Sequence, residues 1–272
     1  MATITEQASA HRNLEKKSIK EITTLINKED ASVAGAIKKA LPQVNQLIQL
    51  IVDTLKGGGR MFYIGAGSGG RLSVLDVIEL PTTFGIPKGL VNSILAGGIP
   101  ELAEAREEKE DNPEAGWEAL KDHKISSRDM VIGISASGTT PFVLGALKSC
   151  REHHIPTGCI VSNPGSPIAS QADFPVEVIT GPEFITGSTR MKCGTAQKML
   201  FDMISTTVMI RMGKVEDNKM VNVLLINDKI TDRAVKMLME KAEIRDYEEA
   251  RRLLLDQGSV KKAMDHLKNP VL

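Results

Sequence analysis

The sequence predicts an α/β protein: a parallel β-sheet sandwiched between helices. Short apolar runs of strand length alternate with segments whose apolar residues recur at helical spacing, so right-handed crossover helices should join parallel strands. Two of the runs end in turns rich in glycine and serine, and each turn leads at once into a helical segment. Strands are expected at Met61–Ile64, Leu90–Leu95, Met130–Ile134, Thr157–Val161 and Pro175–Ile179.

The first part of the chain, residues 1–50, is expected to form an N-terminal helical segment. From Ser18 to about Leu55 the chain has helical character, and its apolar residues recur at three- and four-residue steps, as on one face of an amphipathic helix. The run Gly57–Gly59 should end this helix just before the first strand.

Residues 51–214 are expected to form the sheet domain and residues 215–272 a small C-terminal helical region. The sheet domain closes with a helix, Thr195–Met212, which is apolar almost all round and should be buried within the domain or in a subunit contact. After Val221 the chain becomes charged and helical, and it ends in the pattern helix, Gly258, helix.

Composition narrows the function classes. Lys and Arg number 34, as do Asp and Glu, so no net field favours nucleic acid or an anionic membrane as a partner. Scattered histidines and three cysteines without metal-ligand spacing argue against a metal, and no cofactor motif stands out. No apolar run has the length of a membrane span, and the N-terminus lacks a secretory apolar core, so we expect a cytoplasmic protein.

The most informative segment is Met61–Arg71, MFYIGAGSGGR, in which a strand, a tight turn and a helix start follow one another. This arrangement aims free backbone N–H groups and the positive end of a helix dipole at one point, which suits a phosphate. The candidate ligand-binding residues of this loop are Gly67, Ser68 and Gly69.

A dinucleotide site is the first alternative for this loop, because Gly65, Gly67 and Gly70 satisfy G-x-G-x-x-G. That fingerprint also requires an acidic residue at the end of the second strand. Here the second strand ends in Ala96, and Asp76 lies too early, inside the intervening helix. The glycine spacing alone is therefore a weak indication.

A second loop, Ser135–Pro141, follows the strand at Met130–Ile134 and precedes an apolar helix. Its hydroxyls at Ser135, Ser137 and Thr140 are placed to converge on an anion that the backbone amides attract. The alternative for Thr140 is a simple helix N-cap. The chain contains no G-x-x-x-x-G-K-[ST] motif, so a nucleotide P-loop is not indicated.

These loops resemble the sugar isomerase (SIS) phosphosugar-binding fold and, within it, the N-acetylmuramic acid 6-phosphate etherase family. The resemblance runs from about Thr5 to Lys262. Its blocks, in order, are TEQAS, NLEKKSIKEI, GAGSGGRLSVLDVIELPTTFGIP, LAGG, EKEDNPEAG, GISASGTTPFV, SNPGSP, TGPEFITGSTRMKCGTAQKM and VEDNKMVNV. The glucokinase regulatory proteins share several blocks, and they supply the alternative of a non-enzymatic phosphosugar sensor.

The resemblance implies a lyase that cleaves the lactyl ether of the 6-phosphosugar to give N-acetylglucosamine 6-phosphate and D-lactate. It implies that Glu110 is the base that removes the C2 proton, and that Glu79 is the acid that protonates the departing lactate. From the sequence alone, Glu79 is notable as a charge on an otherwise apolar segment. Glu110 alone would pass for a surface residue.

A third block precedes the apolar helix, where Ser188 and Thr189 are candidates for a further wall of hydroxyls. An ordinary capping turn is the alternative. Glu183, in the same block, either touches the sugar or pairs at the surface. Two positions depart from the family pattern: Gly69 stands where a hydroxyl is usual, and Thr139 stands where a cation is usual.

The distance between Glu79 and the first loop raises a question of assembly. A helix rises about 1.5 Å per residue, so Glu79 should lie roughly 15 Å beyond Ser68. A hexose phosphate is shorter than that. Either the helix breaks early, or Glu79 serves a phosphate held by other loops. We expect a homodimer with the site at its interface, as the resemblance also implies.

Overall fold

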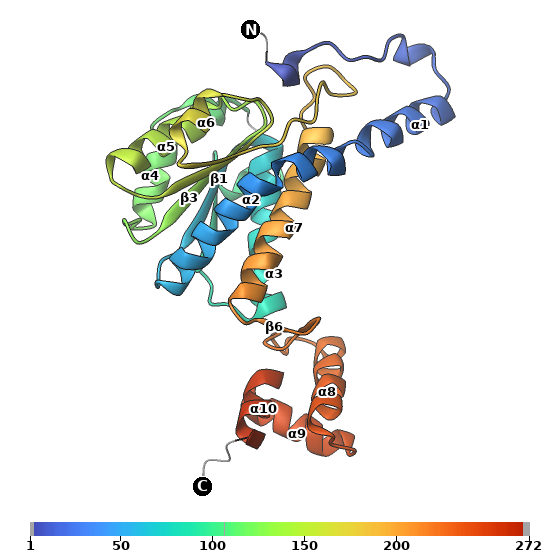
Figure 1. Ribbon diagram of the computed structural model, residues 1–272, viewed down its shortest axis with the longest axis vertical. Helices are drawn as coiled ribbons and strands as arrows, with labels where there is room; N and C mark the ends of the chain where they lie inside the picture. Colours follow the sequence, from blue (N-terminus) through green and yellow to red (C-terminus); the bar gives the residue numbers. More distant parts are fainter. Residues whose placement is uncertain (1–2, 106, 269–272) are drawn as a thin grey trace. The chain divides into compact units, whose positions relative to one another are not determined.

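The computed structural model describes residues 3–105 and 107–268. The chain divides into two compact units (Figure 1). The first comprises the residues up to Asp76 together with Gly89–Ile204, and it contains the sheet. The second comprises Val77–Lys88 and the residues from Ser205 onward. None of the described helices is both long and apolar enough to cross a membrane.

The sheet of the first unit has five parallel strands in the order β2-β1-β3-β4-β5. Its strands confirm the predicted set, each within about two residues: β1 Met61–Gly65, β2 Val91–Leu95, β3 Met130–Ser135, β4 Thr157–Val161 and β5 Phe174–Glu177. In the register, Gly65 at the end of β1 lies opposite both Leu95 of β2 and Ile134 of β3. The carboxyl ends of these strands therefore meet at one edge.

Helices cover both faces of the sheet, so the predicted sandwich is confirmed. One face packs on α4 Ala115–Asp122, α5 Pro141–Glu152 and α6 Pro167–Gln171 (Figure 1). The other packs on α2 Val33–Lys56 and α7 Lys192–Arg211. On that side the ring of Phe201 stands edge-on to Tyr63 with centroids 5.0 Å apart. Leu47 lies so close to β4 that a methyl built on Gly158 would be 2.5 Å from it.

The N-terminal helical segment is interrupted. It forms α1 Ile19–Asp30 and then α2, with Ala31 and Ser32 between them. A reciprocal capping box between Ser18 and Glu21 fixes the start of α1. Helix α1 buries none of its residues, whereas α2 buries a full apolar stripe. Two short turns precede α1: η1 Ile4–Glu6 and η2 Leu14–Lys16.

Helix α7 occupies the segment expected to be an all-apolar helix, and most of its apolar side chains are buried. Met199 and Ile210 are exceptions, with exposed fractions of 37% and 48%. The remaining long helix, α3 Gly67–Phe84, follows β1 directly and continues without a break through Pro81.

The second unit carries a β6–β7 hairpin (Val215–Glu216 and Lys219–Met220) followed by α8 Asp228–Ala242, α9 Tyr247–Gln257 and α10 Val260–Lys268. The pattern helix, Gly258, helix is confirmed, since Gly258 ends α9 in the left-handed region with φ of +78°. The three helices share a core of Ala234, Val235, Leu238, Ala250, Leu254, Val260 and Ala263.

One close packing contact with helix α5 positions the segment that carries Glu110. Helix α5 approaches this segment at Gly145, where an added methyl would lie 1.9 Å from the carbonyl oxygen of Pro113. We expect Gly145→Ala to lower the free energy of unfolding by about 1–3 kcal/mol through overpacking, although alanine is the better helix former. Chemical denaturation measures the change.

Gly35→Ala is the matched control. Gly35 also lies within a helix, α2, but an added methyl there would have nothing within 4 Å. This variant should be stabilised by up to about 1 kcal/mol. Equal stabilisation of the two variants would contradict the close contact at Gly145.

Candidate active site

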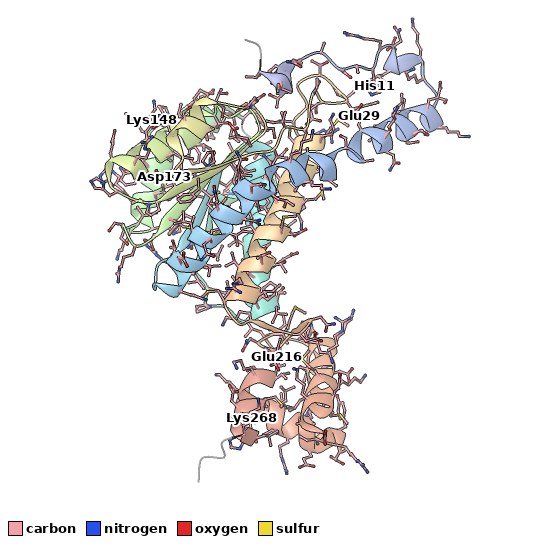
Figure 2. All side chains as sticks on the ribbon, viewed as in Figure 1. His11, Glu29, Lys148, Asp173, Glu216 and Lys268 are labelled. Atoms are coloured by element: carbon pink, nitrogen blue, oxygen red, sulfur yellow. The ribbon has the colours of Figure 1, made fainter. Side chains whose placement is uncertain are left out.

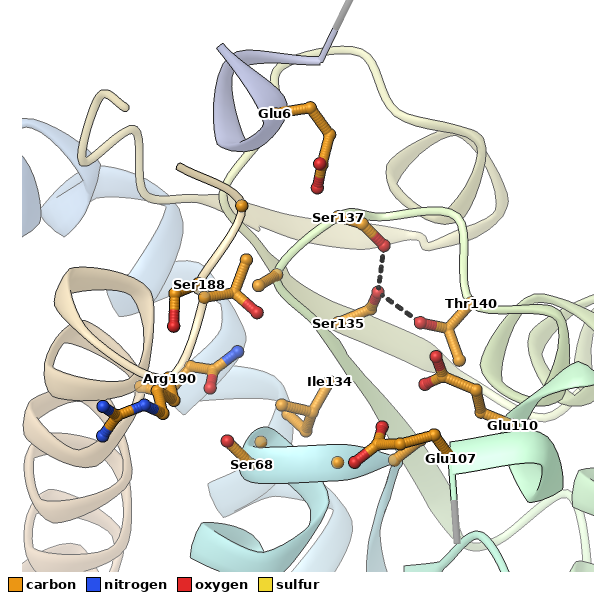
Figure 3. Close-up of a pocket in the computed structure, with 17 residues that line it drawn as sticks. Glu6, Ser68, Glu107, Glu110, Ile134, Ser135, Ser137, Thr140, Ser188 and Arg190 are labelled. Carbon is orange, nitrogen blue, oxygen red and sulfur yellow. Dashed lines mark hydrogen bonds between the residues drawn. The ribbon is translucent and has the colours of Figure 1, made fainter. Parts of the chain in front are cut away.

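A cavity of about 410 Å³ opens where the carboxyl ends of β1 and β3 lie side by side (Figure 3). The chain leaves β1 toward β2 and leaves β3 toward β4, on opposite sides, so this is the switch point at which open α/β sheets bind ligands. Six segments line the cavity: Glu6; Ala66, Gly67, Ser68 and Gly69; Glu107 and Glu110; Ile134, Ser135, Ala136, Ser137 and Thr140; Gly187, Ser188, Thr189 and Arg190; and Gln197.

The β1–α3 loop has the predicted strand, turn and helix geometry. Gly67 opens α3 with φ of +53°, in the left-handed region that favours glycine. A methyl on Gly70 would lie 2.8 Å from the Gly65 carbonyl oxygen, so the turn closes too tightly for a side chain. As a result, Gly67, Ser68 and Gly69 all reach the cavity at the positive end of the helix dipole.

The hydroxyls of the β3–α5 loop converge as predicted. The Ser135 hydroxyl lies 2.9 Å from that of Thr140 and 3.3 Å from that of Ser137 (Figure 3), and it accepts the Gly138 N–H at 3.0 Å. Thr140 stands at the N-cap position of α5 but makes no side-chain capping bond. Its hydroxyl therefore belongs to the cluster and does not cap the first amides of α5.

Two of the predicted binding residues do not line the cavity. Thr139 is exposed, and its N–H and hydroxyl both donate to the Ser137 hydroxyl, at 3.2 and 3.0 Å. Glu183 is 1% exposed, and its carboxylate accepts the N–H groups of Lys192 and Cys193, each at 2.9 Å. Glu183 therefore caps the start of α7 and supports the cavity wall from behind.

The same cap leaves Ser188 and Thr189 available. Both residues line the cavity, while the first amides of α7 are satisfied by Glu183. The turn that carries the two hydroxyls is held by backbone bonds from Ser188 to Ile185 and from Gly194 to Thr189, each 3.0 Å. The described residues thus place a third group of hydroxyls in the cavity.

Of the two predicted catalytic glutamates, the cavity contains one. Glu110 lies on η4 (Glu107–Asp111), is half-buried and lines the cavity. Burial raises the pKa of its carboxyl above the ordinary value, and the neighbouring charges of Glu107 and Asp111 raise it further. Such a carboxylate is a stronger base than an exposed one.

Glu79 lies elsewhere. It is exposed on α3 and is not among the residues that line the cavity. Because α3 is continuous from Gly67 to Phe84, an early break of this helix does not bring Glu79 back toward the loop. Within a single chain, Glu79 therefore does not contribute to the cavity that contains Glu110.

The N-terminal turn is a part of the site that pattern reasoning missed. The backbone N–H of Thr5 donates to the Asn163 side chain at 3.2 Å, and the Asn163 amide donates to the Thr5 hydroxyl and to the Ser137 carbonyl, each at 2.9 Å. These bonds hold Glu6 against the cavity (Figure 3). The only sequence signal was the TEQAS block, which gave no spatial partner.

An ion-pair cluster fixes the next part of the N-terminal segment. Glu29 accepts from Lys192 at 2.6 Å and pairs with His11 at 3.0 Å (Figure 2). The hydrogen bonds from Lys192 and then from His11 lower the pKa of Glu29. The His11 ring also packs on Phe184, with centroids 4.9 Å apart. This cluster ties the segment to the start of α7.

Among the remaining lining residues, three with charged or amide side chains were not predicted: Glu107, Arg190 and Gln197. Arg190 is exposed, and its guanidinium points away from the Ser135 cluster (Figure 3). Within the described part of the chain, no three His, Cys, Asp or Glu side chains gather as a metal site requires.

Comparisons with known proteins agree with this geometry. Residues 43–151 match the glucokinase regulatory protein N-terminal SIS domain, and residues 116–206 match the SIS domain. Among solved structures, a phosphoheptose isomerase from Neisseria gonorrhoeae is similar with a TM-score of 0.55 and 15% identity, covering 70% of this chain and 99% of that one. A phosphoheptose isomerase from Francisella tularensis gives 0.51 and 16%, covering 70% and 97%. At these identities the likeness shows the fold.

Curated relatives are far closer in sequence. The N-acetylmuramic acid 6-phosphate etherase of Bacteroides thetaiotaomicron is 55% identical, over 96% of this chain and 94% of the relative. That of Porphyromonas gingivalis is 53% identical, over 97% and 96%. With near-complete coverage at such identity, the chain belongs to the N-acetylmuramic acid 6-phosphate etherase family, on the SIS fold.

Proposed function

We propose that this protein is a carbon–oxygen lyase that cleaves the D-lactyl ether of N-acetylmuramic acid 6-phosphate, giving N-acetylglucosamine 6-phosphate and D-lactate. The observation that carries the proposal is the near full-length identity to relatives that bear this etherase name. The cavity supports it, because it combines converging hydroxyls with a half-buried carboxyl of raised pKa at Glu110.

The phosphate is held by neutral donors. The hydroxyls of Ser135, Ser137 and Thr140 face the cavity beside the first amides of α3, and Ser188 and Thr189 add a second side. Each hydrogen bond to a charged group contributes about 1.5–3 kcal/mol net, so a few such bonds anchor the substrate without a cluster of arginines.

The reaction is an elimination followed by addition of water. In the open-chain sugar, the C2 proton lies next to the C1 aldehyde, and Glu110 removes it. The electrons of the broken C–H bond form a C2–C3 double bond, and the C3–O ether bond breaks. Glu79 gives its proton to the departing lactate oxygen, and it then takes a proton from the water that adds to C3, while Glu110 returns its proton to C2.

A homodimer brings the two glutamates together in this proposal. Glu79 is exposed on an unbroken helix and does not reach the cavity of its own chain, so the second copy supplies it. The same helix exposes two apolar side chains, Leu75 at 39% and Ile78 at 61%, as expected of a surface that a second chain covers.

The function and the roles of the glutamates are tested with N-acetylmuramic acid 6-phosphate in deuterated water. The wild-type protein should release D-lactate. Glu110→Gln should lose both D-lactate release and C2 exchange, while Glu79→Gln should lose release and keep some exchange, because its step follows proton removal. Each loss should be about 10²–10⁴-fold. NMR and an enzymatic lactate assay provide the readouts.

Glu108→Gln is the control, since Glu108 is exposed on the same turn but does not line the cavity. It should behave as the wild type. A Glu110→Gln protein that exchanges the C2 proton at the normal rate would refute the role of the base. A wild-type protein that binds the sugar and never releases lactate would instead be a phosphosugar sensor.

The shared site predicts complementation between two inactive variants. In a mixed dimer of Glu79→Gln and Glu110→Gln chains, one of the two sites regains both glutamates and the other site has neither. After subunit exchange at equal amounts, activity should recover to about a quarter of the wild-type value. No recovery despite demonstrated exchange, or a fully active monomer in sedimentation, would rule out a shared site.

A further inference from the structure

One buried polar side chain faces the cavity without a partner. Gln197, on α7, is 3% exposed and lines the cavity. Within residues 3–105 and 107–268, its side-chain amide makes no hydrogen bond. Its polar atoms are not fully enclosed by protein and open on the cavity, so only water can bond to them until a ligand binds. Its donors and its acceptor are thus free for a ligand.

The surroundings of this amide are well defined. A methyl built on Gly69 would lie 3.0 Å from the Gln197 carbonyl oxygen, 3.1 Å from its nitrogen and 2.8 Å from the Cγ2 methyl of Ile134. The amide and the methyl are therefore neighbours over the first turn of α3. Figure 3 shows Ile134 between Ser68 and Ser135, at the base of the cavity.

The polar atoms of Gln197 and the methyl of Ile134 favour some chemical groups of a phosphosugar over others. A phosphate offers only acceptors, so it would leave the buried carbonyl oxygen of Gln197 without a donor. A single hydroxyl can bond to the Gln197 amide, but it brings no apolar group to Ile134. An acetamido group is a trans amide whose N–H and methyl lie on the same side, so it offers a donor to the Gln197 oxygen and a methyl to Ile134 together.

We propose that Gln197 and Ile134 form the subsite for the 2-acetamido group of the sugar, an inference that rests on the proposed function. The Gln197 carbonyl oxygen accepts the acetamido N–H, and Ile134 packs on the acetyl methyl, which lies on the same side of the trans amide as that N–H. Because C2 carries both this group and the proton that leaves, the pairing also turns C2 toward Glu110. Gln197 is thus a specificity-determining and positioning residue.

Calorimetric binding of N-acetylglucosamine 6-phosphate and glucose 6-phosphate tests the subsite. The wild-type protein should prefer the acetylated sugar by about 10- to 100-fold, the effect of one neutral hydrogen bond and one buried methyl group. Gln197→Met conserves volume and removes the amide, so it should lose most of this preference while binding glucose 6-phosphate as before. Gln49→Met, on the exposed face of α2, is the matched control and should keep the preference.

The outcomes separate the subsite from the function. If the wild-type protein binds the two sugars with equal affinity, the subsite proposal is wrong. The proposed function is then still tested separately, by the release of D-lactate. Equal weakening of both sugars by Gln197→Met also overturns it, since the amide would then serve the phosphate. If neither sugar binds the wild-type protein, both the subsite proposal and the proposed phosphosugar function are wrong.

If Gln197→Met does not fold, a modified sugar tests the subsite with the wild-type protein. N-methylation of the acetamido group of N-acetylglucosamine 6-phosphate should lower the affinity of that sugar at least tenfold, and an unchanged affinity refutes the pairing.

Discussion

The site depends on the parallel pairing of β1 with β3. Gly65 lies opposite Ile134 in this register, so the two loops that follow these strands start at the same height on the same edge. The contact between Gly65 and Gly70 then turns the chain sharply enough for α3 to begin within the cavity wall. A shift of either strand by one residue would reverse the faces of its side chains and separate the loops.

The lining of this cavity offers more neutral dipoles than positive charge. Hydroxyls and amides line the wall, Arg190 is a cation beside them, and the carboxylates of Glu6, Glu107 and Glu110 are also present. An excess of acidic groups would repel a phosphorylated sugar if they lay near the phosphate. They suit the opposite end of the ligand, where Glu107 raises the pKa of Glu110 and so strengthens the proposed base.

Local patterns in the sequence predicted the sheet and the two glycine- and serine-rich loops, because strand length, turn chemistry and helix starts are encoded within a few residues. Glu6 could not be found in this way, since its place depends on bonds between Thr5 and Asn163, which lie 158 residues apart in the sequence. Gln197 was hidden for another reason: α7 carries several polar residues, and the sequence does not show which of them faces a cavity.

Glu183 shows the converse. Its sequence motif predicted a residue that binds the sugar, yet the Glu183 carboxylate caps the start of α7. A motif identifies residues that a site needs, but it does not separate those that touch the ligand from those that hold the wall. The capping bonds and the 1% exposure of Glu183 make that distinction.

The central claim is that the ether is cleaved on the sugar side, at C3, and an isotope measurement in water enriched in oxygen-18 tests it most directly. Elimination breaks the bond between C3 and the ether oxygen, so that oxygen leaves with lactate and the oxygen of water is added at C3. Mass spectrometry should therefore find the label in the sugar product and none in the hydroxyl of lactate. Label in lactate would mean that water attacks the lactyl carbon, which contradicts the proposed roles of Glu110 and Glu79.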